Sequence, residues 1–270
     1  MLSFLVLGPM EVRTHDRTVT FKGPIQQTLL AMFLCSGEKL ITVNALIEEL
    51  WGTTPPATVE NALQANISRL RRTLARLEPR RQESRLATRT SGYQFNLERA
   101  ELDAAKMLET VDSIRARAGN YRRRDVADLR EVLALWRGPV FGGLTGGPIC
   151  QAAVAKYDEY RTAALVMLYE AELAGGEHAK IVPELRELVT ENSSQECFSS
   201  LLMIALYRSG RQTDALTVAR QLRTNLIDEL GIEPSPAVQD LERAILNHDI
   251  RMRQENTELP WLSYRSGRAA

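Results

Sequence analysis

The stretch that decides the fold is 57–77, ATVENALQANISRLRRTLARL, together with 86–97, LATRTSGYQFNL, which follows after a short break. The first stretch carries an apolar residue at every third or fourth position, the period of an α-helix with one buried side. We therefore predict a helix over about 57–77. Its apolar stripe, expected to pack inward, consists of Val59, Leu63, Ile67, Leu70, Leu74 and Leu77.

The side of this helix opposite the stripe is polar, small and basic, since successive residues are turned by about 100°. Asn and Gln can pair with adenine, Arg can bind guanine or phosphate, and small residues let a helix approach DNA closely. An arginine-rich outer face is more often only a solvated surface, so this helix alone leaves both interpretations open. The candidate DNA-contacting residues on it are Asn61, Gln64, Ala65, Ser68, Arg69, Arg71 and Arg72.

The second stretch indicates a β-hairpin. Residues 86–90 and 93–97 have strand character and flank Ser91-Gly92, a two-residue hairpin signal. A hairpin directly after such a helix is typical of the wing of a winged helix, which favours DNA binding. Arg89, near the tip, is expected to enter a minor groove or hold phosphate. Tyr93 is expected either to bond phosphate through its hydroxyl or to pack half-buried.

The residues before the helix complete a small domain. Short strands are predicted at 4–7, near Val12 and at 19–21, and these would form a small antiparallel sheet. One helix is predicted to begin at Pro24, which suits a first turn. A second helix is predicted after Thr42, whose side chain can cap it.

The residues after the hairpin are predicted to be helical. From Glu101 onward strand signals are absent, and helical patterns alternate with short Gly-, Pro- and Asn-containing breaks. A period of 34 residues relates Leu173–Glu177 to Tyr207–Arg211, a spacing typical of tetratricopeptide repeats. Such repeats stack paired helices and leave a concave surface that commonly holds another protein. Two similar units are few, so this surface could also serve only the fold or a dimer.

The predicted fold is mainly α: an N-terminal winged helix-turn-helix with a small antiparallel β-sheet and a wing hairpin, then an all-α tetratricopeptide-like domain. The predicted divisions are a DNA-binding domain at 1–98, a repeat domain at 99–250 and a polar tail at 251–270. The net charge is zero, but residues 1–98 carry +3 and residues 99–270 carry −3. Eight arginines lie between Ala57 and Tyr93, a local basic patch expected for phosphate contact.

Composition and motifs argue against several other classes of protein. Hydrophobic residues at 44% and charged residues at 25% are typical of soluble globular chains. No run approaches the roughly 18 to 20 apolar residues of a membrane span, so we expect a cytoplasmic protein without membrane contact. The three cysteines are far apart and are expected to be buried thiols. The glycine-rich run 142–147 lacks a following Lys-Ser/Thr, which favours a loop over a nucleotide site; no cofactor, metal or enzymatic activity is predicted.

The order of sheet, three helices and wing, with ISRLRRTL at 67–74 followed by TRTSGY at 88–93, resembles the DNA-binding domain of the OmpR/PhoB-type response regulators. The resemblance covers about residues 4–98. It implies that the stretch from Asn61 to Arg72 lies in the major groove, that Arg89 lies in the wing and that Tyr93 touches the DNA backbone.

The chain also departs from that pattern. Asn61, Asn66 and Ser68 stand where many relatives have more basic residues, so the target sequence cannot be transferred from them. The phosphate-accepting receiver domain that normally precedes this module is missing from the sequence. Activation by aspartyl phosphorylation is therefore not expected.

Three downstream phrases resemble the bacterial transcriptional activator domain: ALWRGP at 134–139, ALYRSGR at 205–211 and DELGIEPSP at 228–236. Joined to an OmpR-type winged helix, they resemble the architecture of the Streptomyces antibiotic regulatory protein family over about residues 3–250. The resemblance implies an activator of secondary-metabolite genes that binds direct repeats in promoter DNA and recruits RNA polymerase holoenzyme with its sigma factor. The chain is similar to the small stand-alone form, or to a truncation of a larger one.

Physical size adds an expectation about assembly. One winged helix reads about half a turn of DNA, so useful specificity needs two protomers about one helical turn apart, a homodimer on DNA.

Two other functions stay open, a repeat adaptor whose winged helix contacts protein and a repressor with the same fold. The run Arg122-Arg123-Arg124 could touch DNA or polymerase, or be a solvated cluster. Affinity that falls steeply with salt would distinguish a DNA-binding protein from an adaptor.

Overall fold

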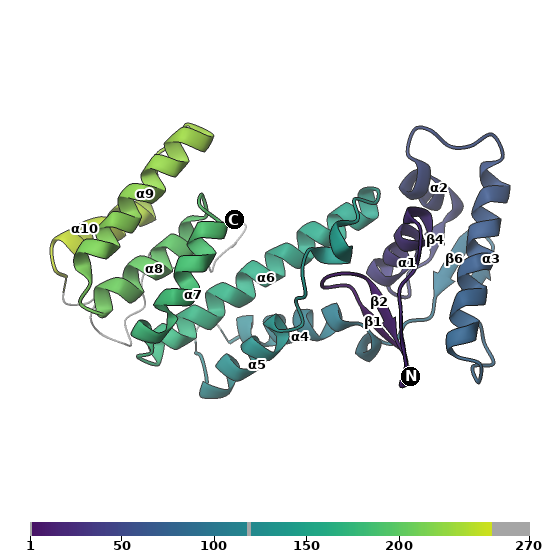
Figure 1. Cartoon of the computed structure of the whole chain (residues 1–270), viewed down its shortest axis with the longest axis horizontal. Coiled ribbons are helices and arrows are strands. Elements are labelled where there is room, and N and C mark those ends of the chain that lie inside the picture. Colours follow the sequence, from purple (N-terminus) through teal and green to yellow (C-terminus); the bar gives the residue numbers. More distant parts are fainter. Residues whose placement is uncertain (1, 118–119, 250–270) are drawn as a thin grey trace. The chain divides into compact units, whose positions relative to one another are not determined.

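The computed structural model describes residues 2–117 and 120–249 (Figure 1). The chain divides into two compact units, Met1–Asp112 with Glu131–Thr162, and Ser113–Arg130 with Ala163–Ala270. This division differs from the sequence-based boundary at residue 98, because residues 99–112 and 131–162 join the winged helix in the first unit. The tail predicted at 251–270 lies outside the described residues.

The first sheet is antiparallel and has the order β1 (Ser3–Leu5), β2 (Glu11–Arg13) and β3 (Thr18–Val19). β1 ends before the predicted residue 7 because the amides of Val6 and Leu7 donate to the Asp103 carboxylate, at 2.9 and 3.2 Å. β3 lies slightly before the predicted 19–21. The Thr14 hydroxyl accepts the amides of the two residues that precede β3 and so turns the chain there.

Three helices follow, α1 (Pro24–Ser36), α2 (Val43–Trp51) and α3 (Val59–Leu77). The predictions for the first two are confirmed: Pro24 begins α1, and Thr42 caps α2 by accepting the Ala45 amide at 3.3 Å. α3 begins two residues later than predicted. Four residues of its apolar stripe are buried and the two at its ends are half-buried; the buried ones are Leu63, Ile67, Leu70 and Leu74.

The predicted hairpin consists of β5 (Leu86–Arg89) and β6 (Gly92–Phe95), and β4 (Ile41–Thr42) completes a sheet of order β4-β6-β5. The register pairs Arg89 with Gly92, so the turn is 90–91 and the predicted Ser91-Gly92 turn is one residue off. Gly92 belongs to the strand because β4 passes very close. A Cβ atom on Gly92 would lie 2.0 Å from the Ile41 carbonyl oxygen.

Aromatic rings join these pieces into one core. The ring of Phe95 in β6 stacks on Phe33 of α1, with centroids 5.9 Å apart, and meets Phe4 of β1 edge-on at 5.8 Å. All three rings are fully buried. The first sheet, the first helix and the hairpin therefore share a single hydrophobic centre.

Residues 131–162 are attached to the winged helix by backbone and carboxylate hydrogen bonds. The amides of Arg137 and Phe141 donate to the carbonyls of Leu7 and Val6, at 2.7 and 2.9 Å. The buried Glu49 carboxylate of α2 accepts three amides around the start of α6 (Pro148–Ala174), those of Gly147, Ile149 and Cys150 at 2.7 to 3.0 Å. The first two residues of the glycine-rich run 142–147, predicted to be a loop, end a short 3₁₀ turn, η2 (Val140–Gly143), and the others lead into α6.

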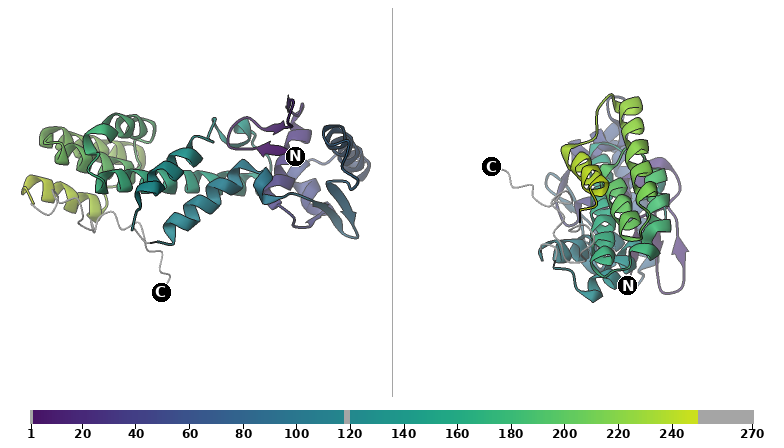
Figure 2. Two further views of the ribbon diagram at one scale, coloured as in Figure 1. Left: turned by 90° about the horizontal axis from the view of Figure 1, so that it is seen from below. Right: turned by 90° about the vertical axis from the view of Figure 1, so that its left-hand side faces the viewer.

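The rest of the described chain is helical, as predicted. The 34-residue period appears directly in the turns: the Gly176 amide donates to the Leu173 carbonyl, and the Gly210 amide donates to the Tyr207 carbonyl. Both glycines have positive φ, 79° and 75°. Helices α7 to α10 pack in sequence order and lie side by side in Figure 2. The bounds are η1 (Arg99–Glu101), α4 (Asp103–Arg115), α5 (Arg123–Leu133), α7 (His178–Glu191), α8 (Glu196–Arg208), α9 (Gln212–Leu230) and α10 (Pro236–Leu246).

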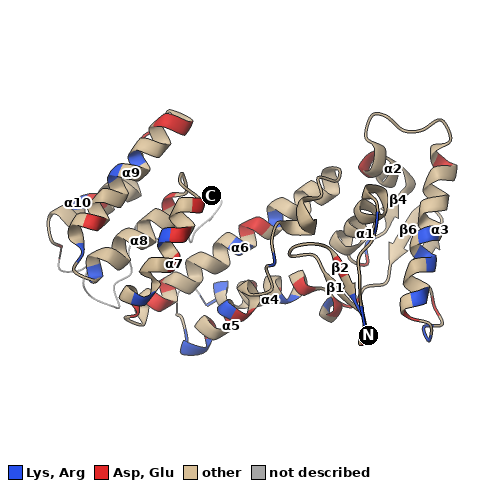
Figure 3. Ribbon diagram, in the orientation of Figure 1, with Lys and Arg blue, Asp and Glu red and all other residues tan. Residues whose placement is uncertain are grey.

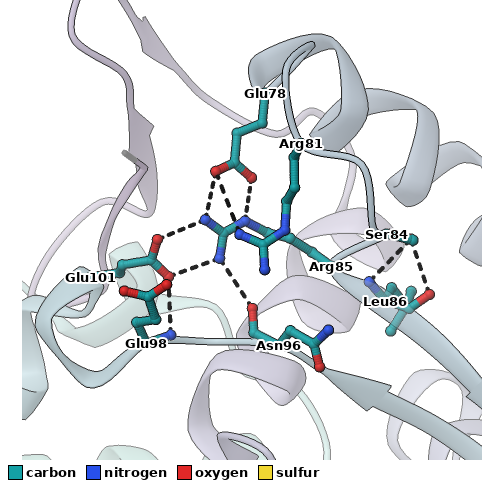
Figure 4. A network of polar contacts seen from close by, with 8 residues as sticks. All are labelled: Glu78, Arg81, Ser84, Arg85, Leu86, Asn96, Glu98 and Glu101. Carbon is teal, nitrogen blue, oxygen red and sulfur yellow. Dashed lines mark hydrogen bonds and ion pairs between the residues drawn. The ribbon is translucent and has the colours of Figure 1, made fainter.

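A buried arginine connects the end of α3, the base of the hairpin and η1 (Figure 4). Arg85 forms ion pairs with Glu78 and with Glu101, the latter at 2.6 Å, and donates to the Asn96 carbonyl at 3.0 Å. The side chains of Arg85 and Glu101 are each 2% exposed. Arg85 also lies over the Phe4 ring, 5.4 Å from its centroid. The pairing raises the pKa of Arg85 although burial opposes this, so the guanidinium stays charged.

We predict that Arg85→Met lowers the free energy of unfolding by about 3 to 5 kcal/mol, because it leaves the buried Glu101 and the half-buried Glu78 without their cation. Urea unfolding followed by circular dichroism measures this loss. Arg81→Met is the matched control, since exposed Arg81 lies 3.9 Å from Glu78 and such a pair contributes at most about 1 kcal/mol. Equal losses in the two variants would contradict the role of Arg85.

The same pair predicts a dependence on pH. Burial alone would raise the pKa of Glu101, but hydrogen bonds from Arg85 and the Glu98 amide outweigh it and the pKa is lowered. The stabilisation is therefore complete above the ordinary value of 4.5 and is lost as pH falls through the lowered pKa. The difference in unfolding free energy between wild type and Arg85→Met should shrink from pH 7 to pH 3.5. A constant difference across this range in urea titrations would refute the prediction.

Candidate nucleic-acid interface

The predicted recognition face of α3 is open to solvent. Its buried stripe packs on the winged-helix core, and the opposite side chains project outward. Figure 3 shows basic residues along this helix. Six of the seven residues predicted on this helix are exposed, namely Asn61, Gln64, Ala65, Ser68, Arg69 and Arg72. The polar and small ones occupy the first half of the helix, and the arginines occupy the second.

Arg71 differs from the other predicted residues because it is half-buried against the hairpin. Its Nε donates to the Leu86 carbonyl at 2.8 Å, and its Nη2 donates to the Thr88 hydroxyl at 2.7 Å. Its guanidinium carbon lies 5.7 Å from the centroid of the Tyr93 ring. The structure thus brings Arg71 and Tyr93 together and directs both into the contact between α3 and the wing.

Arg89 stands at the end of β5, beside the turn, and is exposed. Its Nε donates to the side-chain oxygen of Gln94 at 2.9 Å, and the Gln94 amide donates to the Glu38 carbonyl at 2.8 Å. Sequence reasoning missed Gln94 and Thr88. The hairpin register pairs Thr88 with Tyr93. The predicted turn is one residue off, so it would have paired Thr88 with a different residue.

Two residues of the basic stretch serve packing. Asn66 is half-buried and accepts a hydrogen bond from Gln26 of α1 at 2.8 Å. An asparagine at this position, where many relatives have a more basic residue, therefore serves the contact between α3 and α1. Arg85, one of the eight arginines in the basic patch, is buried in its double ion pair. At the end of α3 the exposed Arg17 donates to the Arg76 carbonyl at 3.1 Å, which brings a further arginine to this side of the domain.

Three further observations on the described residues concern metal ligands, membrane spans and thiols. No group of three His, Cys, Asp or Glu side chains within 2–117 and 120–249 could hold a metal ion. No helix among them is long and apolar enough to cross a membrane. Of the three cysteines, only Cys150 is buried as predicted, while Cys35 and Cys197 are half-buried. Burial raises the pKa of Cys35 to about 12, so its thiol is a poor nucleophile at neutral pH.

Two families match successive parts of the chain. Residues 18–95 match the family described as transcriptional regulatory protein, C terminal. Residues 102–246, more than half of the chain, match the bacterial transcriptional activator domain.

Individual relatives are similar over nearly the whole chain. Regulatory protein AfsR of Streptomyces coelicolor is 35% identical over 92% of this chain, which spans 24% of AfsR. Transcriptional regulator RedD of the same species is 34% identical over 90% of this chain and 70% of RedD.

A solved structure has the same architecture. Mycobacterium tuberculosis EmbR, in complex with a low affinity phosphopeptide, superimposes with a TM-score of 0.81 at 29% identity and covers 92% of this chain and 65% of its own. The winged helix, the repeat helices and these matches agree, and the chain belongs to the Streptomyces antibiotic regulatory protein family of transcriptional regulators.

Proposed function

We propose that this chain is a sequence-specific DNA-binding transcription activator whose α3 enters the major groove while the hairpin crosses the neighbouring minor groove or backbone. The exposed face of α3, with the hairpin held beside it, carries the proposal. Helix α3 has 19 residues and is therefore about 28 Å long. Because the major groove curves around the duplex, we expect a straight helix of this length to meet base edges along only part of its face.

The two halves of α3 suit different parts of DNA. Asn61, Gln64, Ala65 and Ser68 offer amide groups and small side chains, which suit base edges. Arg69, Arg72 and Arg76 follow at spacings of three and four along one exposed row, which suits phosphates at the edge of the groove. We infer that the first half reads sequence and the second half anchors the helix.

The finer proposal concerns assembly and activation. Because one domain reads about half a turn, we infer that two protomers bind direct repeats about one turn apart. Promoters of secondary-metabolite clusters and contact with RNA polymerase holoenzyme, including its sigma factor, are proposed from membership of the family. A regulator with this target would act in the cytoplasm at the nucleoid.

We predict that Arg72→Ala weakens binding to promoter DNA from the gene's own neighbourhood and lowers the slope of log affinity against log salt by about 1, because one phosphate contact is lost. Fluorescence anisotropy between 50 and 200 mM salt measures both quantities. Arg220→Ala is the matched control, since both arginines are exposed and donate from Nε to the carbonyl four residues earlier at 3.4 Å. Equal salt slopes for all three proteins would contradict the assignment, and no binding by wild type would favour the adaptor.

Activation itself is tested by transcription from the bound promoter with purified RNA polymerase holoenzyme. We expect transcript levels to rise when wild-type protein is added and to rise less with Arg72→Ala at the same concentration, because the variant occupies less of the promoter. Run-off transcription on a template with both repeats, and on one with a single repeat, measures this and the need for two protomers. A fall in transcript with wild type would identify a repressor.

A further inference from the structure

Beyond the Arg85 ion pairs at the base of the hairpin, the side-chain hydrogen bonds described between α3 and the wing come from Arg71. β5 is the edge strand of its sheet, because the order β4-β6-β5 leaves it a neighbour on one side. The Arg85 carbonyl points toward β6, where it accepts the Asn96 amide at 2.7 Å. Carbonyls alternate along a strand, so the Leu86 carbonyl faces the open edge, and Arg71 Nε donates to it at 2.8 Å.

The same guanidinium reaches both strands of the hairpin. Its Nη2 donates to Thr88 on β5 at 2.7 Å, and its carbon lies over the ring of Tyr93 on β6 at 5.7 Å. A two-stranded hairpin is marginally stable alone, and β4 adds a strand of two residues. Phe95 and Arg85 hold the base of the hairpin, and the anchoring to α3 through Arg71 adds to how firmly the rest of the wing is held.

We propose that Arg71 is a positioning residue: it fixes the wing relative to α3, so that Arg89 meets the minor groove at a set distance from the bases that α3 reads. The inference rests on the proposed function. Two series of hydrogen bonds hold the hairpin. One leads from α3 through Arg71 to β5, and the other leads from Glu38 through Gln94 to Arg89.

This arrangement has a consequence for the DNA that the protein selects. An arginine held rigidly at a minor groove favours a narrow groove, which A·T-rich tracts provide through their more negative potential. A firmly held wing therefore adds a preference for an A·T-rich flank at one fixed offset from the core site. A loosely held wing loses that preference while α3 still reads the core.

The experiment compares wild type with Arg71→Met, which keeps the aliphatic stem, and Thr88→Val, which removes one acceptor. Arg72→Met is the neighbouring control. Hydrogen exchange of the free proteins measures the hairpin at 86–95 and α3 separately. Binding is measured on two duplexes selected by wild type from a random library, with the same core and either an A·T tract or a G·C tract on the wing side.

We expect hairpin amides to exchange at least tenfold faster in Arg71→Met, with α3 unchanged, and a smaller effect in Thr88→Val. We also expect wild type to favour the A·T flank about fivefold or more, and Arg71→Met to bring this ratio close to one with little loss on the G·C duplex. Arg72→Met should weaken binding to both duplexes and keep the ratio.

Three results would overturn the proposal. Unchanged hairpin exchange in Arg71→Met would show that Arg71 does not hold the wing. Equal weakening on both duplexes with the ratio kept would show that Arg71 contacts DNA directly. A wild-type ratio near one would remove the flank preference. Failure of wild type to select any duplex would instead refute the proposed function, and hydrogen exchange would still decide whether Arg71 holds the wing.

Discussion

The ion pairs of Arg85 are the interaction on which the arrangement of the DNA-facing elements depends. Glu78 follows α3, Arg85 precedes β5, and Glu101 ends η1, so one guanidinium joins three segments that the chain reaches in succession. Burying such charges is costly, and the cost is met only where the geometry satisfies every group. Here two carboxylates and a carbonyl receive the donors, and Phe4 covers the guanidinium. The recognition helix and the wing therefore diverge from a common fixed base.

Two further carboxylates extend this rigidity to residues beyond the winged helix. Asp103 accepts the amides of Val6, Leu7 and Ala104, and Glu49 accepts amides at the start of α6. Burial raises the pKa of Asp103 even though these amides favour its charged form. At both places a side-chain carboxylate accepts backbone amides that have no partner in a strand or at the start of a helix. The first unit consequently includes residues that the sequence pattern assigns to the repeat domain.

Local signals predicted the elements well, and long-range contacts explain the misses. Thr42 marks the start of α2, the apolar stripe marks α3, and the 34-residue period marks the turns at Gly176 and Gly210. The predicted hairpin turn is one residue off because Gly92 packs closely against the backbone of Ile41, which lies far away in sequence. The exposed residues of α3 followed from helical period alone. The roles of Arg71 and Arg85 could not be predicted from the period, because their partners lie in other elements. The sequence alone does not show whether an arginine side chain is buried.

The repeat domain contains a helix with an unusual environment. Ten successive residues of α8, from Phe198 to Tyr207, are buried on every side of the helix, including Ser199 and Ser200. Such a helix acts as the spine of its domain, since almost any change along it would disturb packing. The neighbouring helices α7, α9 and α10 each present an outer side to solvent. A substitution on those sides leaves the core packing intact, so a surface for new protein partners can form there while the spine, and with it the fold, stays the same.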